Sequence, residues 1–177
     1  MIFVVRHGHA GDKHKWHGPD HIRPLSDTGR RESHGLLTRL GGFTLSAIRS
    51  SPSTRCVQTV DGLAHQRGLP VRIDTRLSPD ADLDDLLRLV FTADDVVLCT
   101  HGEVIGRLLD ALRDRGAPVS AFAEWPKGST WILDIAGGAV RSATYLPPLA
   151  GAALEPGVSA RAIPGQRSSA ALGKPSA

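Results

Sequence analysis

Two histidines and two arginines follow short apolar runs, at places where a phosphoryl-transfer site could be assembled. One run ends in Arg6-His7-Gly8, a second is followed by Arg55, and a later run leads into His101. The planar guanidinium of arginine binds phosphate oxygens in pairs and stays charged. A neutral imidazole can attack phosphorus and form a covalent intermediate, which divides one difficult step into two easier ones. These residue types therefore indicate chemistry at a phosphoryl group.

The chemistry of phosphoryl transfer indicates a different role for each of these residues. One imidazole would be the nucleophile, while the second imidazole and the arginines would stabilise charge on the equatorial oxygens. Gly8 would allow the backbone to approach a ligand closely. Any one of these residues alone would be an ordinary surface arginine or a hydrogen-bonded histidine. Their common position after apolar runs favours a site.

The elements that must position these residues alternate along the chain. Short runs rich in Val and Ile predict buried strands, and apolar residues at helical spacing predict helices between them. A pair of runs separated by Gly137-Gly138 predicts a hairpin. The predicted strands cover residues 1–5, 47–50, 71–74, 96–100, 130–135 and 140–145, and the predicted helices cover residues 28–40, 54–66, 82–91 and 103–113.

This alternation predicts an α/β fold with a mostly parallel sheet, helices on both faces and a C-terminal antiparallel hairpin. In such sheets ligands bind beyond the carboxyl ends of the strands. The Arg6-His7-Gly8, Arg55 and His101 positions should then meet on one rim, next to a helix N-terminus that favours anions. We expect His7 to stand at a solvent-facing strand end.

The composition is that of a soluble globular domain. The chain has 177 residues, of which 41% are hydrophobic and 22% charged, and it contains no apolar run of the length that crosses a membrane. The N-terminal apolar run stops at Arg6, which makes it too short for a signal peptide. Cys56 and Cys99 form neither a disulfide framework nor a zinc motif, and Cys56 is expected to be a buried structural thiol. A cytoplasmic enzyme without a membrane partner is expected.

The basic charge belongs mainly to the C-terminal end. Residues 150–177 are mostly Ala, Gly, Ser and Pro and carry three basic side chains against one acidic, whereas the whole chain has a net charge of +3. Their composition predicts a flexible tail after a single domain at residues 1–149. The remaining near-neutral body argues against a nucleic-acid partner, because non-specific binding needs clustered phosphate neutralisation.

The three strand-end groups also carry a family resemblance. Val5-Arg6-His7-Gly8, Ser50-Ser51-Pro52 with Arg55, and Thr100-His101-Gly102 resemble the histidine phosphatase superfamily (branch 1), whose fold is that of the phosphoglycerate mutases. The segment 23–29 is similar to the SixA-type branch of phosphohistidine phosphatases. The segment 127–131 is similar to the phosphatase domain fused to some Nudix hydrolases that sanitise nucleotides. The resemblance covers about residues 1–146.

The resemblance implies roles for particular residues. His7 would accept the phosphoryl group, and Arg6, Gly8, Arg55 and His101 would complete the phosphate pocket. Family members that cleave stable esters place a carboxylic acid near the site to protonate the leaving group.

In the matching region of this chain the first candidate for that acid is Asp80, and Asp82 is the second. Both could equally be turn or helix-cap residues. An absent acid would favour phosphohistidine or a phosphoanhydride over a sugar ester, since imidazole and phosphate are tolerable leaving groups. Ala10, where many mutase-like members have Ser or Thr, argues against mutase activity.

Three functions remain open at this point. They are a phosphatase for phosphohistidine proteins, a hydrolase of nucleoside di- or triphosphates, and a non-catalytic phosphate-binding module. Lys13, Trp16 and Arg23 are candidate substrate-binding residues, with an ordinary exposed loop as the alternative. Five histidines between His7 and His21 lack zinc-site spacing, so neither a metal nor another cofactor is expected. The substrate would be a phosphorylated protein, metabolite or nucleotide, and the sequence does not indicate an oligomeric state.

Overall fold

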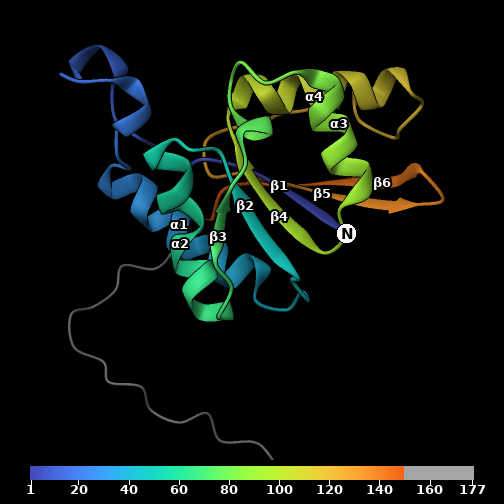
Figure 1. Ribbon diagram of the computed structural model, residues 1–177, viewed down its shortest axis with the longest axis horizontal. Coiled ribbons are helices and arrows are strands. Elements are labelled where there is room, and N and C mark those ends of the chain that lie inside the picture. Colours follow the sequence, from blue (N-terminus) through green and yellow to red (C-terminus); the bar gives the residue numbers. More distant parts are fainter. Residues whose placement is uncertain (150–177) are drawn as a thin grey trace, which may run out of the picture.

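A six-stranded sheet forms the centre of the computed structural model, which describes residues 1–149 (Figure 1). The predicted tail at 150–177 lies outside the described residues. Across the sheet the strands follow the order β3-β2-β4-β1-β5-β6. Their bounds are β1 Ile2–Arg6, β2 Ala47–Ser50, β3 Val71–Ile73, β4 Val96–Thr100, β5 Thr130–Ala136 and β6 Ala139–Leu146.

The pairing of the strands confirms the predicted sheet. β1 runs parallel to β4, and β2 runs parallel to both β4 and β3. β5 pairs antiparallel with β1 and with β6, so the predicted hairpin closes one edge. Its turn is formed by Gly137 and Gly138, whose φ values of 62° and 74° suit residues without a Cβ.

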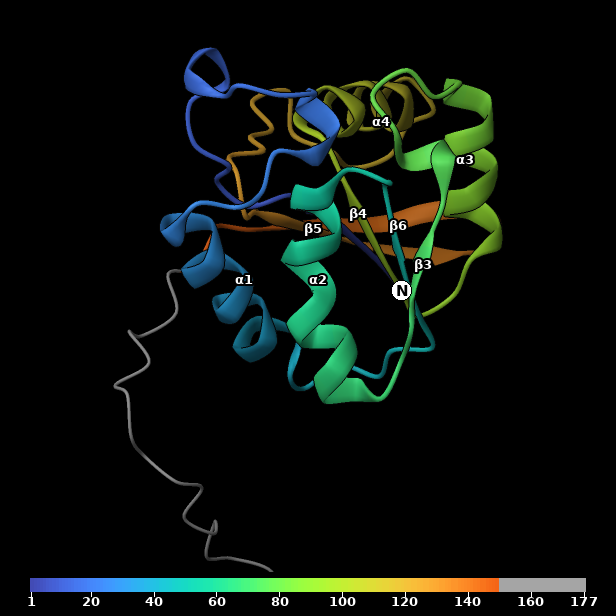
Figure 2. The same ribbon diagram turned by 60° about the vertical axis from the view of Figure 1, so that its left-hand side comes forward.

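Two helices cover each face of the sheet, as Figures 1 and 2 show. α1 (Asp27–Leu40) and α2 (Thr54–Arg67) pack on one face, and α3 (Leu83–Thr92) and α4 (Gly102–Asp114) pack on the other. Each helix begins or ends within one or two residues of its predicted bounds. Ser26 caps α1 by accepting a hydrogen bond from the backbone N–H of Gly29, as expected for a serine before a helix.

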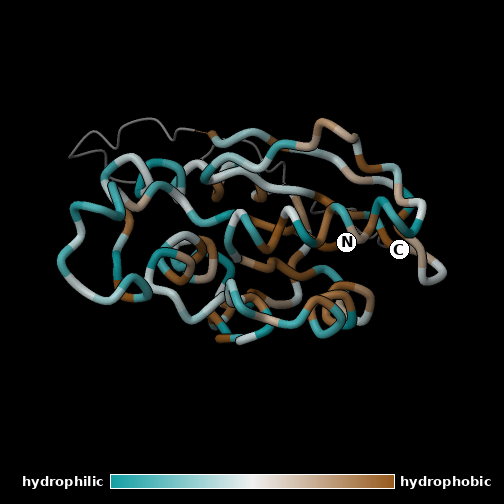
Figure 3. The backbone as a smooth tube through the Cα atoms, turned by 90° about the horizontal axis from the view of Figure 1, so that it is seen from above, coloured by the Kyte–Doolittle hydropathy of each residue, from teal (hydrophilic) through white to brown (hydrophobic). Residues whose placement is uncertain are grey.

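The central strands are buried on both faces, so successive side chains of β1 enter different cores. Ile2 and Val4 join the core beneath α3 and α4, whereas Phe3 and Val5 join the core beneath α1 and α2. This explains why β1 is a continuous apolar run rather than an alternating one. In Figure 3 many of the hydrophobic segments lie towards the inside of the molecule, and hydrophilic loops lie on the outside.

Three short 3-10 helices were not predicted, because three residues are too few for a periodic pattern. η1 (Lys13–Lys15) and η2 (Asp20–Ile22) lie between β1 and α1, and η3 (Thr75–Leu77) follows β3. Figure 2 shows the segment with η1 and η2 beside the N-terminal end of α2. Within residues 1–149 no helix is both long and apolar enough to span a membrane.

Candidate active site

The two predicted histidines lie side by side because two adjacent parallel strands end at the same level. Arg6 of β1 is paired with Thr100 of β4, and the backbone N–H of His7 donates to the Thr100 carbonyl over 3.0 Å. His7 and His101 follow directly, and their ring centroids are 5.3 Å apart with the planes inclined at 67°. The sheet register therefore determines the distance between the imidazoles.

Arg55 connects the two imidazoles. It lies in the first turn of α2, where its Nε donates to Nε2 of His7 and its Nη2 donates to Nδ1 of His101, each over 3.3 Å. All three residues are buried, with exposed fractions of 5% for Arg55, 6% for His7 and 1% for His101. The expectation of a solvent-facing His7 is therefore wrong, because Arg55 and the segment around η2 cover it.

The hydrogen bonds define the tautomer of each ring, because an arginine can only donate. Nε2 of His7 accepts from Arg55, so its proton is on Nδ1, which donates to the Gly8 carbonyl over 2.8 Å. In His101 the roles are reversed, and Nε2 donates to the Ser51 hydroxyl over 2.9 Å. The lone pair of His7 Nε2 therefore faces Arg55, which also contacts Nδ1 of His101.

Burial keeps His7 in this neutral form. Burial, opposed by the hydrogen bond to the Gly8 carbonyl and reinforced by the electrostatic effects of Arg55, His101 and Arg6, lowers the pKa of His7 to about 3. A neutral imidazole has a lone pair for attack on phosphorus. The arrangement thus suits His7 to be a nucleophile at any ordinary pH.

The low pKa of His7 should make stability depend on pH. The folded-state pKa of about 3 lies below the ordinary 6.5, so the unfolded chain binds more protons between these values. The free energy of unfolding should fall as the pH is lowered from 6.5 towards 3, by up to about 1.4 kcal/mol per pH unit. In urea unfolding between pH 6 and pH 4.5, His7→Asn should show a flatter profile than the wild type.

Asp74 supplies a separate window for that comparison. Hydrogen bonds from Arg76 and Arg49 lower the pKa of Asp74 to about 2, so its contribution to stability is lost only as the pH falls from 3.8 towards 2. Titration of Asp74 should therefore not affect the difference in unfolding free energy between wild type and His7→Asn above pH 4.5. A variant profile as steep as that of the wild type would contradict a neutral buried His7.

Arg6 adds a second arginine to the site. Its Nη1 donates to the Trp125 carbonyl over 2.7 Å, while its buried Nε has no hydrogen-bond partner among the described residues. A Cβ on Gly102 would lie 2.8 Å from Cζ of Arg6, so a larger residue at that helix start would displace the Arg6 guanidinium. Burial lowers the pKa of Arg6, against the opposing effect of Glu103. The cluster of Arg6, His7, Arg55 and His101 is called the phosphate cluster below.

Backbone contacts hold the loop that follows His7. The N–H of Gly8 donates to the Thr59 hydroxyl over 2.9 Å, and the N–H of Gly128 donates to the His7 carbonyl over 3.2 Å. A Cβ on Gly8 would lie 3.0 Å from the Gly29 carbonyl oxygen, so Gly8 permits a close approach of the loop to α1. Gly8 is therefore placed beside the cluster, as predicted.

The two candidate acids lie on the loop between η3 and α3. Asp80 is exposed and lines an open hollow of about 320 Å³, and within residues 1–149 it forms no hydrogen bond or ion pair with the phosphate cluster. The loop borders the cluster, since Thr100 Oγ1 donates to the Leu77 carbonyl over 2.7 Å. Asp82 caps α3 by accepting from the N–H groups of Asp84 and Asp85.

The three candidate substrate-binding residues have different surroundings. Arg23 is buried and donates from Nε to Asp20, so it adjoins the cluster through that carboxylate. Lys13 is exposed at the start of η1. Trp16 donates from its indole to the Pro19 carbonyl and has no hydrogen bond to the cluster among the described residues.

Several contacts of the cluster were missed at the level of sequence. Asp20 forms an ion pair with Arg55 and with Arg23. Cys56 is buried as expected, but its Sγ is 3.6 Å from Nε2 of His101, a contact that helix geometry brings about and sequence adjacency does not reveal. The spacing of Asp20 three residues before Arg23 was the available signal, since it permits an i,i+3 pair.

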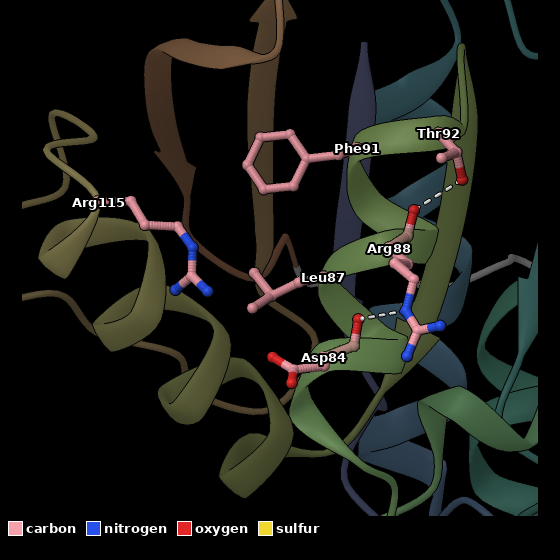
Figure 4. A pocket seen from close by; sticks show the side chains of 6 residues that line it. All are labelled: Asp84, Leu87, Arg88, Phe91, Thr92 and Arg115. Carbon is pink, nitrogen blue, oxygen red and sulfur yellow. Dashed lines mark hydrogen bonds between the residues drawn. The ribbon is translucent and has the colours of Figure 1, made fainter.

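A second hollow lies apart from the phosphate cluster. Its volume is about 440 Å³, and Figure 4 shows Leu87 and Phe91 of α3 facing it together with Arg115. No residue of the phosphate cluster lines it. Among residues 1–149 no three His, Cys, Asp or Glu side chains are grouped as metal ligands.

The fold and the phosphate cluster together define a class. Two histidines and two arginines meet at the carboxyl ends of β1, β4 and the start of α2, in a sheet of this order. Residues 2–79 match the family model of the histidine phosphatase superfamily (branch 1). This match assigns residues 2–79 of the chain to the superfamily.

Particular relatives differ in the substrates that their names state. The chain is 30% identical over 154 residues to an 8-oxo-(d)GTP phosphatase of Mycolicibacterium smegmatis, a match that covers 83% of this chain and 48% of that protein. The chain thus spans about half the length of this curated relative.

Solved structures share the fold. The protein histidine phosphatase SixA in complex with tungstate has a TM-score of 0.64 at 19% identity, over 82% of this chain and 93% of the other. A mycobacterial glucosyl-3-phosphoglycerate phosphatase with inorganic phosphate has a TM-score of 0.59 at 21% identity, over 85% of this chain and 97% of the other.

Proposed function

We propose that the protein is a metal-independent phosphatase that works through a phosphohistidine intermediate on His7. The observation that carries the proposal is the lone pair of Nε2 in a neutral His7, held next to Arg55 and His101. Arg6 and Arg55 supply fixed positive charge for the phosphoryl oxygens. His101 Nδ1 faces the same space as the lone pair of His7.

The proposed reaction has two steps. In the first, Nε2 of His7 attacks phosphorus, a P–N bond forms, and the bond to the leaving group breaks with its electron pair. In the second, water attacks the same phosphorus, the P–N bond breaks, and inorganic phosphate leaves while His7 becomes neutral again. The Nδ1 proton of His7 remains bonded to the Gly8 carbonyl throughout, which keeps the ring oriented.

A phosphohistidine protein is the first candidate substrate. Protonation of the leaving group matters least when that group is an imidazole, and Asp80 makes no hydrogen bond to the phosphate cluster among the described residues. The small domain and the Arg23-Pro24-Leu25 segment resemble the SixA-type branch, and the fold of SixA is similar. These observations favour a phosphoramidate over an alkyl ester.

A nucleoside di- or triphosphate is the second candidate substrate. It is supported by the 30% identity to the 8-oxo-(d)GTP phosphatase, which extends over 83% of this chain. The leaving group would be a phosphate, which again needs little protonation. Lys13 and Lys127 add cations near the cluster, since the charge of Lys13 lowers the pKa of Asp20 and burial together with Arg6 lowers that of Lys127.

A comparison of second-order rate constants should separate the candidates. The panel contains a phosphohistidine peptide, nucleoside di- and triphosphates including an oxidised guanine nucleotide, and 3-phosphoglycerate. A phosphatase of the first kind should cleave the peptide with a kcat/KM at least about tenfold above the others, which corresponds to 1.4 kcal/mol in transition-state stabilisation. The reverse order would favour the nucleotide candidate.

A labelling experiment tests the class itself. With a generic ³²P-phosphomonoester, rapid quenching should trap an acid-labile, base-stable label on the wild-type protein. Phosphate binding without label or turnover would instead favour the non-catalytic module.

A further inference from the structure

The carboxylate of Asp20 occupies the outer side of Arg55. Its Oδ2 lies 3.1 Å from Nη2 of Arg55, and its Oδ1 accepts from Nε of Arg23 over 3.0 Å. The backbone carbonyl of Asp20 also accepts from Nη1 of Arg55 over 2.7 Å. Asp20 thus contacts Arg55 through both its side chain and its backbone.

These contacts use the donors that a phosphoryl group would need. Nε of Arg55 is directed to His7, and Nη2 is shared between His101 and Asp20. Because Asp20 Oδ2 and His101 Nδ1 both lie within hydrogen-bond distance of Nη2, the carboxylate stands at the edge of the space faced by His7. An incoming phosphoryl oxygen and the Asp20 carboxylate would compete for the same guanidinium.

The burial of the four side chains also indicates that Asp20 covers the site from the solvent side. The side chain of Arg55 is 6% exposed, whereas that of Asp20 is 37% exposed, so Asp20 forms the solvent side of the pair. His7 and His101 are almost fully covered. A substrate can reach His7 Nε2 only if part of this cover moves, and a partly exposed side chain on a three-residue 3-10 helix moves more easily than a strand or α2.

We propose that Asp20 is an internal anion that holds Arg55 in the substrate-free protein and gives up Nη2 of Arg55 to the phosphoryl group of the substrate. The proposal rests on the proposed function only in taking the phosphate cluster as the anion site. After the exchange, Arg23 still donates its hydrogen bond to Oδ1 of Asp20, so the carboxylate stays near the site without an ion pair to Arg55. Asp20 is a positioning residue in this scheme.

The exchange has a definite cost in affinity. Substrate binding must break an ion pair and bring a phosphoryl group close to a carboxylate of the same sign. Removing the charge of Asp20 should therefore strengthen the binding of small oxyanions, whereas loss of a merely structural residue should weaken it or leave it unchanged.

The test compares the binding of sulfate, which remains a dianion over the working pH range, in calorimetric titrations. Asp20→Asn, which keeps an acceptor for Arg23, should bind sulfate about tenfold more tightly than the wild type, a difference of 1.4 kcal/mol. Asp12→Asn is the matched control, because Asp12 is exposed on the same segment and caps η1, a role that asparagine retains. It should change the affinity less than twofold.

Kinetics provide an independent measurement. With an aryl phosphate, Asp20→Asn should lower KM by about the same factor as the sulfate dissociation constant, because the competing anion is gone. Asp20→Glu, which restores the charge, should return both values towards the wild type. Thermal unfolding of each variant verifies that η2 remains packed.

The failure of this proposal differs from the failure of the proposed function. Weaker or unchanged sulfate binding by Asp20→Asn overturns the exchange, even where the wild type binds sulfate and turns over substrate. Wild-type protein that binds no sulfate, or binds it equally well after Arg55→Ala, overturns both the exchange and the phosphate cluster as the anion site.

Discussion

His7→Asn is expected to reduce turnover by about 10⁴-fold or more and to abolish the acid-labile label. The variant loses the atom that we assign to the P–N bond, Nε2 of His7 with its lone pair beside Arg55, and an amide nitrogen cannot replace it. Losses of this size follow removal of a covalent nucleophile in other enzymes. Quenched labelling and steady-state rates on the same sample measure both effects.

His101→Asn separates the two histidines. His101 faces Arg55 through Nδ1 and is held by the Ser51 hydroxyl, so its loss should slow phosphorylation by about 10²- to 10³-fold while phosphate still binds. Circular dichroism and the melting temperature verify the fold of each variant, since both side chains are buried. Retention of more than a few per cent of wild-type activity by His7→Asn would make the nucleophile assignment wrong.

Asp80→Asn is expected to affect substrates according to their leaving groups. If Asp80 protonates the leaving group, alkyl phosphates should lose about 10²- to 10⁴-fold in kcat/KM, the usual range for general acid catalysis. An aryl phosphate such as p-nitrophenyl phosphate should lose much less, because its leaving group needs little protonation. The loop that carries Asp80 is attached to the end of β4 by the bond from Thr100 to the Leu77 carbonyl.

Asp82→Asn tests the second candidate acid in the same way, since asparagine retains the cap of α3. Equal losses for both substrates with Asp80→Asn would indicate a structural or binding role. No loss with either would leave Asp80 a turn residue. A wild-type protein that cleaves phosphohistidine readily but no alkyl phosphate would support the SixA-type candidate.

The parts of the fold with strong local patterns were predictable. β1 and β4 each contain four consecutive apolar residues, and α1 begins after a serine cap, so their bounds agree closely with the sequence prediction. The meeting of His7 and His101 was also predictable, since the carboxyl ends of parallel strands share one edge. This general rule predicts that both histidines lie at the same edge of the sheet. The distance between the two imidazole rings depends in addition on the pairing of Arg6 with Thr100.

The cover over the site could not be predicted in the same way. η1 and η2 are three residues each and have no apolar periodicity, so residues 11–24 read as a loop. The burial of His7 and the ion pair between Asp20 and Arg55 depend on how this loop returns to α2. Such contacts link residues far apart in the sequence, and residue type alone does not reveal them.

The alignment of β1 with β4 has a consequence for how related proteins can differ in substrate specificity. A shift of one residue between these strands would turn every side chain to the opposite face, so the spacing of the two imidazoles is set by the backbone. Residues 11–24, which follow β1, and residues 117–127, which precede β5, contain no residue of the β1–β4 pairing. Chimeras that exchange these segments between relatives should therefore inherit a new specificity while keeping the same transfer chemistry.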